Sequence, residues 1–190
     1  MIWFTSDLHL GHAKVIDFCR RPFKSVEEMD EALIKNWNDT VHPLETVYAL
    51  GDMCFHYSQK GVALMKRLVG RKILIQGNHD TYSLEKYYEA GFSAVMQEAV
   101  INLEGHRVRL SHYPFNPAIW AQGKIILSGQ DVRYLERRPD YNSGQWLLCG
   151  HVHEKWKHVG NQINVGVDQW GMKPVSQGQI ASIMAKNPLT

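Results

Sequence analysis

The sequence predicts an α/β protein in which a mostly parallel sheet comes first along the chain and a more hairpin-rich sheet follows. In the first half, short apolar runs alternate with amphipathic helical segments, a pattern that builds parallel strands. In the second half, strand-like runs follow one another through short, turn-like connections with little helix between them. At 190 residues the chain is long enough for one sizeable core, so we expect a single domain over residues 1–190.

Three apolar runs in the first half, rich in β-branched and aromatic residues, predict buried strands at residues 2–4, 47–50 and 73–75. Residues 24–41 lie between the first two runs and predict an amphipathic helix, because their apolar side chains recur at helical spacing. Ser25 and Glu28 fit a capping box at the start of this helix. Residues 61–69 predict a second helix between the next pair of strands, which favours parallel pairing.

The runs of the second half predict strands at residues 100–103, 105–110, 146–149, 161–167 and 180–184. The segment 113–144 lies between the second and third of these runs. It is polar, punctuated by proline and rich in aromatic residues, so we expect it to be an excursion over the surface rather than a linker between domains.

The composition narrows the function classes. A formal net charge of +2 gives no electrostatic signal for nucleic acid. The three cysteines are odd in number and lack a CxxC spacing, which argues against a disulfide scaffold and against a cysteine zinc site. No apolar run approaches the length of a membrane span or a leader peptide, so we expect a cytoplasmic protein without a membrane partner.

Metal-capable side chains follow five of the apolar runs, at the point where each predicted strand ends. Ligands of open α/β sheets bind outside the carboxyl ends of the strands. Residues two apart in an extended chain point to the same side, so Asp7 can converge with His9, and His151 with His153. A preceding glycine at three of the motifs lets the backbone turn sharply and approach an ion closely. The motifs are Asp7-x-His9, Gly51-Asp52, Gly77-Asn78-His79-Asp80, Ser111-His112 and Gly150-His151-x-His153.

Each motif alone also has a structural explanation. Gly51-Asp52 is an ordinary turn sequence, and a lone His112 is more often a hydrogen-bonded structural histidine than a ligand. Five such motifs in one order are not explained by unrelated structural needs. Together they favour a metal centre at the strand ends.

The ordered set of motifs resembles the five-motif pattern of the calcineurin-like metallophosphoesterases, from the first strand to near the C-terminus. The resemblance implies a four-layer α-β-β-α sandwich, in which two mixed β-sheets pack face to face with helices outside. It also implies a hydrolase with two divalent cations. By matching motif positions, one cation would be bound by Asp7, His9 and His153 and the other by Asn78, His112 and His151, with Asp52 as the bridge.

The implied ligand set combines carboxylate, amide and imidazole donors. Such a set suits manganese, iron, zinc, cobalt or nickel better than calcium, and its geometry does not select among them. We expect manganese in practice, with the others as alternatives.

The implied reaction is direct hydrolysis. Two neighbouring cations can activate a shared water for attack on phosphorus, so no side-chain nucleophile is required. The resemblance places His79 beside the leaving group, which it would protonate, while Asp80 either orients His79 or only supports the loop. Arg137 either contacts substrate or solvates its loop. Candidates for substrate contact are His12, His56, Tyr113 and Arg137.

The sequence favours a phosphodiester of a small molecule or nucleotide as the substrate. Protein phosphatases of the superfamily follow the second motif with an arginine that grips phosphate, whereas here residues 53–56 read Met-Cys-Phe-His. The chain also lacks the extra domains of the superfamily's DNA-repair nucleases, and nothing indicates single-stranded nucleic acid. A phosphomonoesterase, including a nucleotide or protein phosphatase, is the alternative with the same metals. A catalytically silent interaction scaffold is the alternative of another class, and the oligomeric state stays open.

Overall fold

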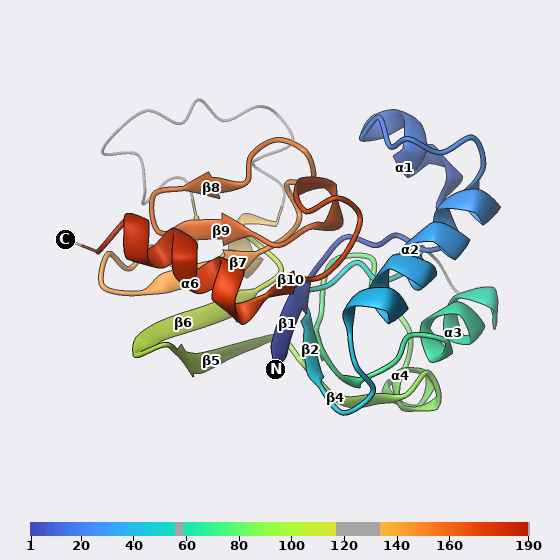
Figure 1. Ribbon diagram of the computed structural model, residues 1–190, viewed down its shortest axis with the longest axis horizontal. Helices are drawn as coiled ribbons and strands as arrows, with labels where there is room; N and C mark the ends of the chain where they lie inside the picture. The colour runs from blue at the N-terminus through green and yellow to red at the C-terminus, as the bar shows by residue number, and fades with distance from the viewer. Residues whose placement is uncertain (56–58, 117–133, 190) are drawn as a thin grey trace.

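The computed structural model describes residues 1–55, 59–116 and 134–189, which form two five-stranded sheets (Figure 1). The first sheet has the order β10-β1-β2-β3-β4. Its strands are β1 (Ile2–Thr5), β2 (Thr46–Ala49), β3 (Arg71–Ile75), β4 (Phe92–Met96) and β10 (Val175–Ser176). Strands β1 to β4 are parallel and β10 is antiparallel, which confirms the parallel pairing expected for the first half.

The second sheet has the order β5-β6-β7-β9-β8. Its strands are β5 (Glu98–Leu103), β6 (His106–Ser111), β7 (Trp146–Cys149), β8 (His158–Val159) and β9 (Gln162–Asn164). The expected hairpins occur only at its two edges, between β5 and β6 and between β8 and β9. Strands β6, β7 and β9 are parallel, and the segments that separate them in the sequence are long enough for the crossovers that parallel pairs require.

Most helices of the described chain belong to its first half. They are α1 (Ala13–Phe18), α2 (Val26–Thr40), α3 (Gln59–Lys66), α4 (Leu84–Glu89) and α6 (Gln177–Lys186), with 3-10 turns η1 (Leu135–Arg137) and η2 (Val167–Gln169). The Ser25 side chain accepts a hydrogen bond from the backbone N–H of Glu28, as a capping box predicts. The Glu28 carboxylate, however, accepts from Lys24, one residue before the N-cap.

The predicted strand at residues 180–184 is wrong, because this segment lies in helix α6. Ser176 and Gln179 form a complete capping box before it. Ile180 and Met184, four residues apart, are both buried on one face of the helix. A short apolar run fits a buried strand and a buried helix equally, and the capping box decides between them.

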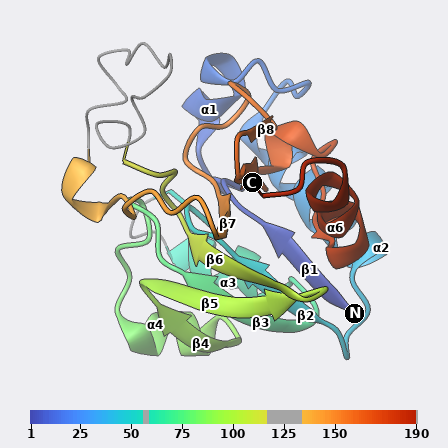
Figure 2. The ribbon, with the colours of Figure 1, turned by 90° about the vertical axis from the view of Figure 1, so that its left-hand side faces the viewer.

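The two mixed sheets pack face to face, and helices α1 to α4 lie outside the first sheet (Figures 1 and 2). Between the sheets, Phe4 and Leu50 join Val108 and Trp146 in one buried cluster, to which α6 adds its apolar face. On the outer side of the second sheet, the described residues that cover Leu147 and Cys149 are Phe115, Tyr141 and Trp156. The protein therefore has the layered α/β architecture that its motifs implied.

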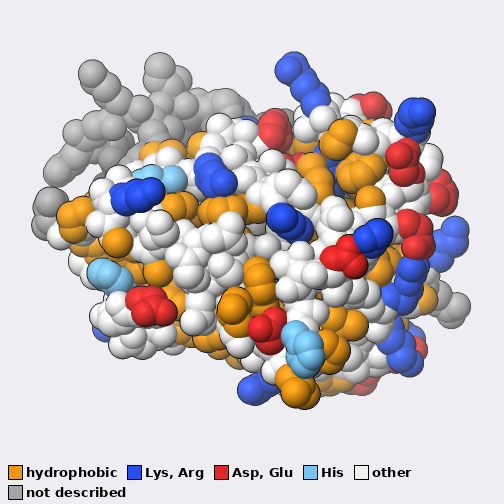
Figure 3. Space-filling model, viewed as in Figure 1, with side chains coloured by type: hydrophobic (Ala, Val, Ile, Leu, Met, Phe, Trp, Pro, Cys, Tyr) orange, Lys and Arg blue, Asp and Glu red, His pale blue; other side chains and the backbone are white. Residues whose placement is uncertain are grey.

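Acidic and basic side chains are intermixed on the face shown in Figure 3, in keeping with the formal net charge of +2. Within the part of the chain that the structure describes, no helix has the length and apolar character needed to cross a membrane.

Candidate metal centre

The five motifs come together at one end of the two sheets. The first three follow the parallel strands β1, β2 and β3, and the last two follow the parallel strands β6 and β7. Backbone hydrogen bonds join the first two loops, from Asp7 N–H to the Gly51 carbonyl and from His9 N–H to the Asp52 carbonyl, each at 3.0 Å. Parallel pairing explains the convergence, because it places the carboxyl ends of neighbouring strands at the same edge.

Asp7, His9 and His153 form the first cluster of possible ligands. One donor atom from each lies within 4.8 Å of the other two. The Nε2 atom of His153 is 3.8 Å from Oδ1 of Asp7, and the rings of His9 and His153 stack with centroids 5.0 Å apart. Asp7 and His9 are buried, while the His153 side chain is 22% exposed and so reaches the open side of the cluster.

Asn78, His112 and His151 form the second cluster. The Nε2 atom of His112 lies 3.2 Å from Oδ1 of Asn78 and 3.2 Å from Nδ1 of His151. The opposite nitrogen of His112, Nδ1, is 2.8 Å from the Leu50 carbonyl, which can only accept a hydrogen bond. In a neutral imidazole, Nε2 therefore carries a lone pair that faces the Asn78 oxygen. Acceptor atoms this close to one another need a cation or a proton between them.

Asp52 lies between the two clusters. Its Oδ2 atom is 3.5 Å from Nε2 of His9 and 3.5 Å from Nε2 of His112. Its other oxygen, Oδ1, accepts a hydrogen bond of 2.9 Å from the backbone N–H of His79. That bond leaves Oδ2 directed toward both histidines, in the position that a shared ligand requires.

The donors at this site fit divalent cations. Both ring nitrogens of His9 are buried and form no hydrogen bond within the described residues. Burial, together with the nearby His153 and Arg21, holds the pKa of His9 well below its usual range, so the ring is neutral and its lone pair is available. Burial and the nearby carboxylates of Asp80 and Asp7 raise the pKa of Asp52 to about 7, although His112 opposes this rise. A cation would relieve the repulsion between Asp52 and the nearby carboxylates, and it would use an unpaired ring nitrogen of His9.

Several of these residues have a left-handed backbone conformation. Such a conformation costs a residue other than glycine roughly 1–2 kcal/mol, and it persists where the surrounding structure enforces it, as at functional sites. Positive φ angles occur at Asp7 (58°), His9 (52°), Asp52 (54°), His151 (70°) and His153 (47°). The strain is thus concentrated at the candidate ligands.

Two glycines allow the loops to meet. A Cβ atom at Gly51, whose φ is +88°, would lie 2.6 Å from Nδ1 of His112. A Cβ atom at Gly150 would lie 2.6 Å from Oδ2 of Asp7 and closer still to the Ser6 hydroxyl. These close approaches are those expected from the glycines of the second and fifth motifs.

The five motifs lie within a segment that matches a known family. Residues 1–174 match the family model of the calcineurin-like phosphoesterase superfamily domain. The chain belongs to this superfamily. Its members bind divalent metals and act on phosphate esters, which agrees with the clustered carboxylates and imidazoles.

The chain is similar to proteins from several different organisms. An uncharacterized protein, MJ1445 of Methanocaldococcus jannaschii, is 31% identical over 97% of this chain and 92% of its own length. The Gene 66 protein of Mycobacterium phage L5 is 32% identical over 96% and 93%. The crystal structure of AQ665 from Aquifex aeolicus, a protein of unknown function, covers 96% of this chain and 98% of its own, with 27% identity and a TM-score of 0.69.

The Asp80 carboxylate accepts backbone hydrogen bonds from the loops of the second and third motifs. It accepts hydrogen bonds from the backbone N–H groups of Asp52 (2.7 Å), Gly77 (2.8 Å) and Met53 (3.1 Å). These bonds occupy both oxygens of a buried side chain. Of the two roles left open for Asp80, the structure favours support of the loops over orientation of the His79 ring.

His79 and His12 border the first cluster. One ring nitrogen of His79 lies within 4.8 Å of donor atoms of His9 and Asp52. The His12 ring is 5.4 Å from that of His9 and stacks on Phe55, with centroids 3.8 Å apart and planes within 6°. The sequence did not indicate Phe55, because an aromatic residue after the second motif has no distinctive spacing. His56 lies outside the residues that the structure describes.

Tyr113 borders the second cluster. Its buried ring meets His112 edge-on at 4.9 Å and lies 5.1 Å from the ring of His151. Burial raises the pKa of Tyr113 to about 12, and the nearby guanidinium of Arg137 opposes the rise. Arg137 lies in η1, and its side chain is exposed.

A buried ion pair behind the first cluster was not indicated by the sequence. The guanidinium of Arg21 pairs with both carboxylate oxygens of Asp168, at 2.8 and 2.9 Å. Oδ2 of Asp168 and Sγ of Cys19 each lie 3.3 Å from Nδ1 of His153. The two charged residues are 147 positions apart and belong to none of the five motifs, so no local pattern connects them.

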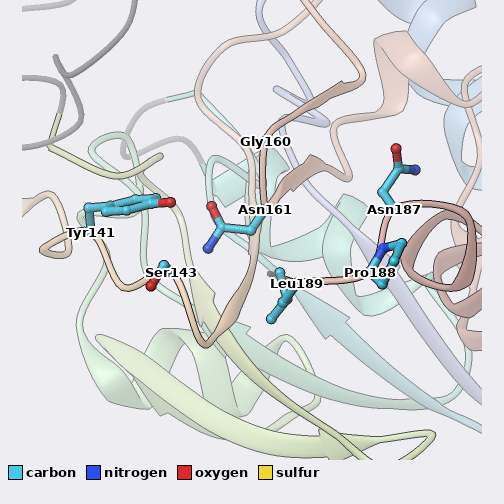
Figure 4. Close-up of a pocket in the computed structure, with 7 residues that line it drawn as sticks. All are labelled: Tyr141, Ser143, Gly160, Asn161, Asn187, Pro188 and Leu189. Carbon is cyan, nitrogen blue, oxygen red and sulfur yellow. The ribbon is translucent and has the colours of Figure 1, made fainter.

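A pocket of about 310 Å³ is lined by none of the metal-ligand candidates (Figure 4). Its lining residues are Tyr141, Ser143, Gly160, Asn161, Asn187, Pro188 and Leu189. None of them belongs to the five motifs. Oδ1 of Asn161 is a buried atom without a hydrogen-bond partner in the described chain. We assign no ligand to the pocket.

Proposed function

We propose that the protein is a phosphodiesterase that binds two divalent cations and hydrolyses a small or nucleotide-like phosphodiester. Asp7, His9 and His153 would hold one cation, and Asn78, His112 and His151 the other. The observation that carries the proposal is the position of Asp52, whose Oδ2 atom lies 3.5 Å from a ring nitrogen of each set. One carboxylate oxygen with a histidine of each set at equal distance suits a bridge between two cations.

Two bound cations would lower the pKa of a shared water and neutralise charge on the phosphoryl oxygens. The chain's own residues prepare the site for them. Burial keeps His9 neutral, and the Leu50 carbonyl fixes the His112 tautomer so that Nε2 faces the site. Hydrogen bonds between the loops would hold the donors in place before any cation binds.

His79 would donate the proton that the leaving-group oxygen needs. Its backbone N–H is hydrogen-bonded to Asp52, so its ring is held next to the proposed bridging residue. Because that ring lies at the edge of the first cluster, it can contact a substrate oxygen without being a metal ligand in this scheme. Asp80 would act indirectly, through the loops that carry Asp52 and His79.

The surroundings of Asp52 support a diester over a monoester. Met53 and Cys54 are 0% and 1% exposed and pack in the core, so neither side chain reaches a bound phosphate. A phosphomonoester carries up to two negative charges near neutral pH, and an arginine after the second motif would compensate them. A diester carries one charge and needs this compensation less.

The experiment is an activity screen of the protein loaded with manganese, iron, zinc, cobalt or nickel. The substrates are bis-p-nitrophenyl phosphate, p-nitrophenyl phosphate, 2′,3′- and 3′,5′-cyclic nucleotides and single-stranded oligonucleotides. We expect manganese-dependent hydrolysis of the diesters, faster than that of the monoester. Asp52→Asn should reduce it by at least about 100-fold, because even outer partners of metal ligands are worth 10–100-fold.

The matched control is Asp39→Asn, which replaces an exposed carboxylate of α2 and should retain full activity. Faster turnover of p-nitrophenyl phosphate would reassign the protein as a monoesterase. If fully metallated protein left every ester intact, the enzymatic proposal would be wrong, and the scaffold alternative would take its place.

A further inference from the structure

The buried pair of Arg21 and Asp168 has no counterpart among the five motifs. Their side chains are 0% and 2% exposed. Removing two charges from water is costly, and such a pair is retained when its geometry is good and its remaining donors are satisfied. Both conditions hold here. The contact with Asp168 is bidentate. The remaining hydrogen bonds of the guanidinium go to Asp7, Leu8 and Met29.

Arg21 connects the pair to the backbone of the first motif. Its Nη2 donates 2.6 Å to the Asp7 carbonyl, and its Nη1 donates 2.9 Å to the Leu8 carbonyl. Asp7 has a strained, left-handed backbone, with φ of 58°. The guanidinium therefore supports the turn in which a proposed ligand is presented.

Asp168 connects the same pair to the fifth motif. Its Oδ2 atom is 3.3 Å from Nδ1 of His153. A carboxylate accepts hydrogen bonds only, so in the neutral ring that a cation would require, the proton stays on Nδ1 and the lone pair of Nε2 faces Asp7. The next residue, Gln169, donates 3.1 Å to the His153 carbonyl, so η2 holds both the ring and the backbone of this histidine.

The second cluster does not share this support. His112 is oriented by the Leu50 carbonyl, at 2.8 Å from Nδ1. Within the described residues, the side-chain hydrogen bonds of Arg21 and Asp168 go to Asp7, Leu8, Met29, His153 and each other. The pair thus touches one proposed metal site only.

We propose that Arg21 and Asp168 are positioning residues for the cation held by Asp7, His9 and His153, and not for the other cation. This inference rests on the proposed function. The pair fixes two of the three ligands from opposite ends of the chain, through the Asp7 backbone and the His153 ring.

A separate ion bound by Cys19, His153 and Asp168 is the competing explanation, because donor atoms of these residues lie within 4.8 Å of one another. Two observations argue against it. Both oxygens of Asp168 already accept from Arg21, and the guanidinium would repel a cation at this point. Cys19 is therefore a neighbour of the His153 ring rather than a ligand in this scheme.

The test is a Mn²⁺ titration of the metal-free protein by calorimetry and EPR. We expect two binding events in the wild type. Asp168→Asn should raise the dissociation constant of one event about 10- to 100-fold and leave the other within about twofold. The EPR signal should change from that of a coupled pair of ions to that of a single ion. Arg21→Lys, which loses the bidentate fork, should weaken the same event.

Double variants identify the affected site. In an Asn78→Ala background, which impairs the second cluster, Asp168→Asn should remove the remaining tight binding. In a His9→Ala background it should have no further effect. Cys19→Ala also changes a neighbour of His153 Nδ1, and Glu31→Gln breaks a bidentate pair with Arg67 outside the site. Both controls should bind Mn²⁺ as the wild type does.

Thermal unfolding of the metal-free variants separates positioning from folding. If Asp168→Asn fails to fold, Arg21→Lys carries the test. Equal loss at both sites, or two wild-type affinities in both variants, would overturn the positioning role and leave the proposed function intact. A wild type that binds two Mn²⁺ ions and hydrolyses no ester would instead overturn the proposed function and leave the positioning role measurable.

Discussion

The carboxylate of Asp80 accepts a hydrogen bond of 2.7 Å from the backbone N–H of Asp52. Two more hydrogen bonds reach this carboxylate, from the backbone N–H groups of Gly77 and Met53. Burial raises the pKa of Asp80, and the three N–H donors oppose that rise by favouring the charged form. The second and third motifs are therefore joined by one side chain before any cation or substrate is considered.

Replacement of Asp80 should act on stability first. Asp80→Ala removes the acceptor of three buried N–H groups, each worth about 1–3 kcal/mol when left unpaired. We expect the free energy of unfolding of the metal-free protein to fall by about 3 kcal/mol or more, measured by urea denaturation. Asp140→Ala, an exposed carboxylate, is the control and should change it little. An unchanged stability with a shifted pH profile would instead indicate that Asp80 tunes His79.

His79→Ala should slow hydrolysis according to the leaving group. A positioned general acid contributes about 10²–10⁴-fold, and its contribution grows as the leaving oxygen becomes more basic. We expect the larger loss with a cyclic nucleotide or alkyl ester and the smaller loss with p-nitrophenyl esters, at equal metal content. His106→Ala, at the start of β6, is the control. Equal losses with every ester would contradict the proton-donor role and indicate binding of phosphate instead.

The strand-end motifs were visible in the sequence because each consists of adjacent residues. Asp7-x-His9 and Gly150-His151-x-His153 were predicted to meet because parallel strands end at one edge. The structure brings Asp7, His9 and His153 together there. His151 does not converge with His153 as expected but faces His112, because the backbone of this motif is left-handed rather than extended. The helix over residues 24–41 was predicted for a similar reason, since its period and its Ser25 cap are local. Both features are local in the chain, so a single sequence is enough to predict them.

The contacts behind those motifs could not be predicted from the sequence. Arg21 and Asp168 meet across 147 positions, and the sequence around each shows nothing unusual. Residues 180–184 were misassigned because a five-residue apolar run has no resolvable period. The second sheet was expected to be rich in hairpins, but β6, β7 and β9 pair in parallel, which no local pattern shows. In each case, tertiary contacts rather than the local sequence determine the structure.

Gly150→Ala should damage the first cluster by crowding alone. The added Cβ would lie 2.6 Å from Oδ2 of Asp7 and would also press on Ser6. Overpacking of this kind costs about 1–3 kcal/mol, and here it would displace a proposed ligand. We expect lower thermal stability and weaker Mn²⁺ binding, measured by calorimetry. Gly144→Ala meets only Asn142, at 3.5 Å, and is the matched control. Full Mn²⁺ affinity in Gly150→Ala would show that the loop adjusts freely.

Lys72 offers a test of the fold away from the metal centre. Its side chain is buried, and its ammonium donates to the carbonyls of Met65 (2.7 Å) and Ala90 (2.8 Å) beside the Phe92 ring. Burial lowers the pKa of Lys72 to about 8. In the unfolded chain a lysine keeps its proton up to a pKa of about 10.4. Between these values the unfolded state binds more protons than the folded state.

The contribution of Lys72 to stability should therefore rise as the pH increases from about 8 to about 10.4, by about 3 kcal/mol in total. Lys72→Met removes the titrating group and should remove this rise, whatever it does to stability at neutral pH. Urea unfolding of both proteins at a series of pH values measures the difference. Lys66→Met, an exposed lysine of α3, should follow the wild-type curve. Parallel curves for wild type and Lys72→Met would show that water reaches the ammonium, because a solvated lysine loses its proton at the same pH in both states.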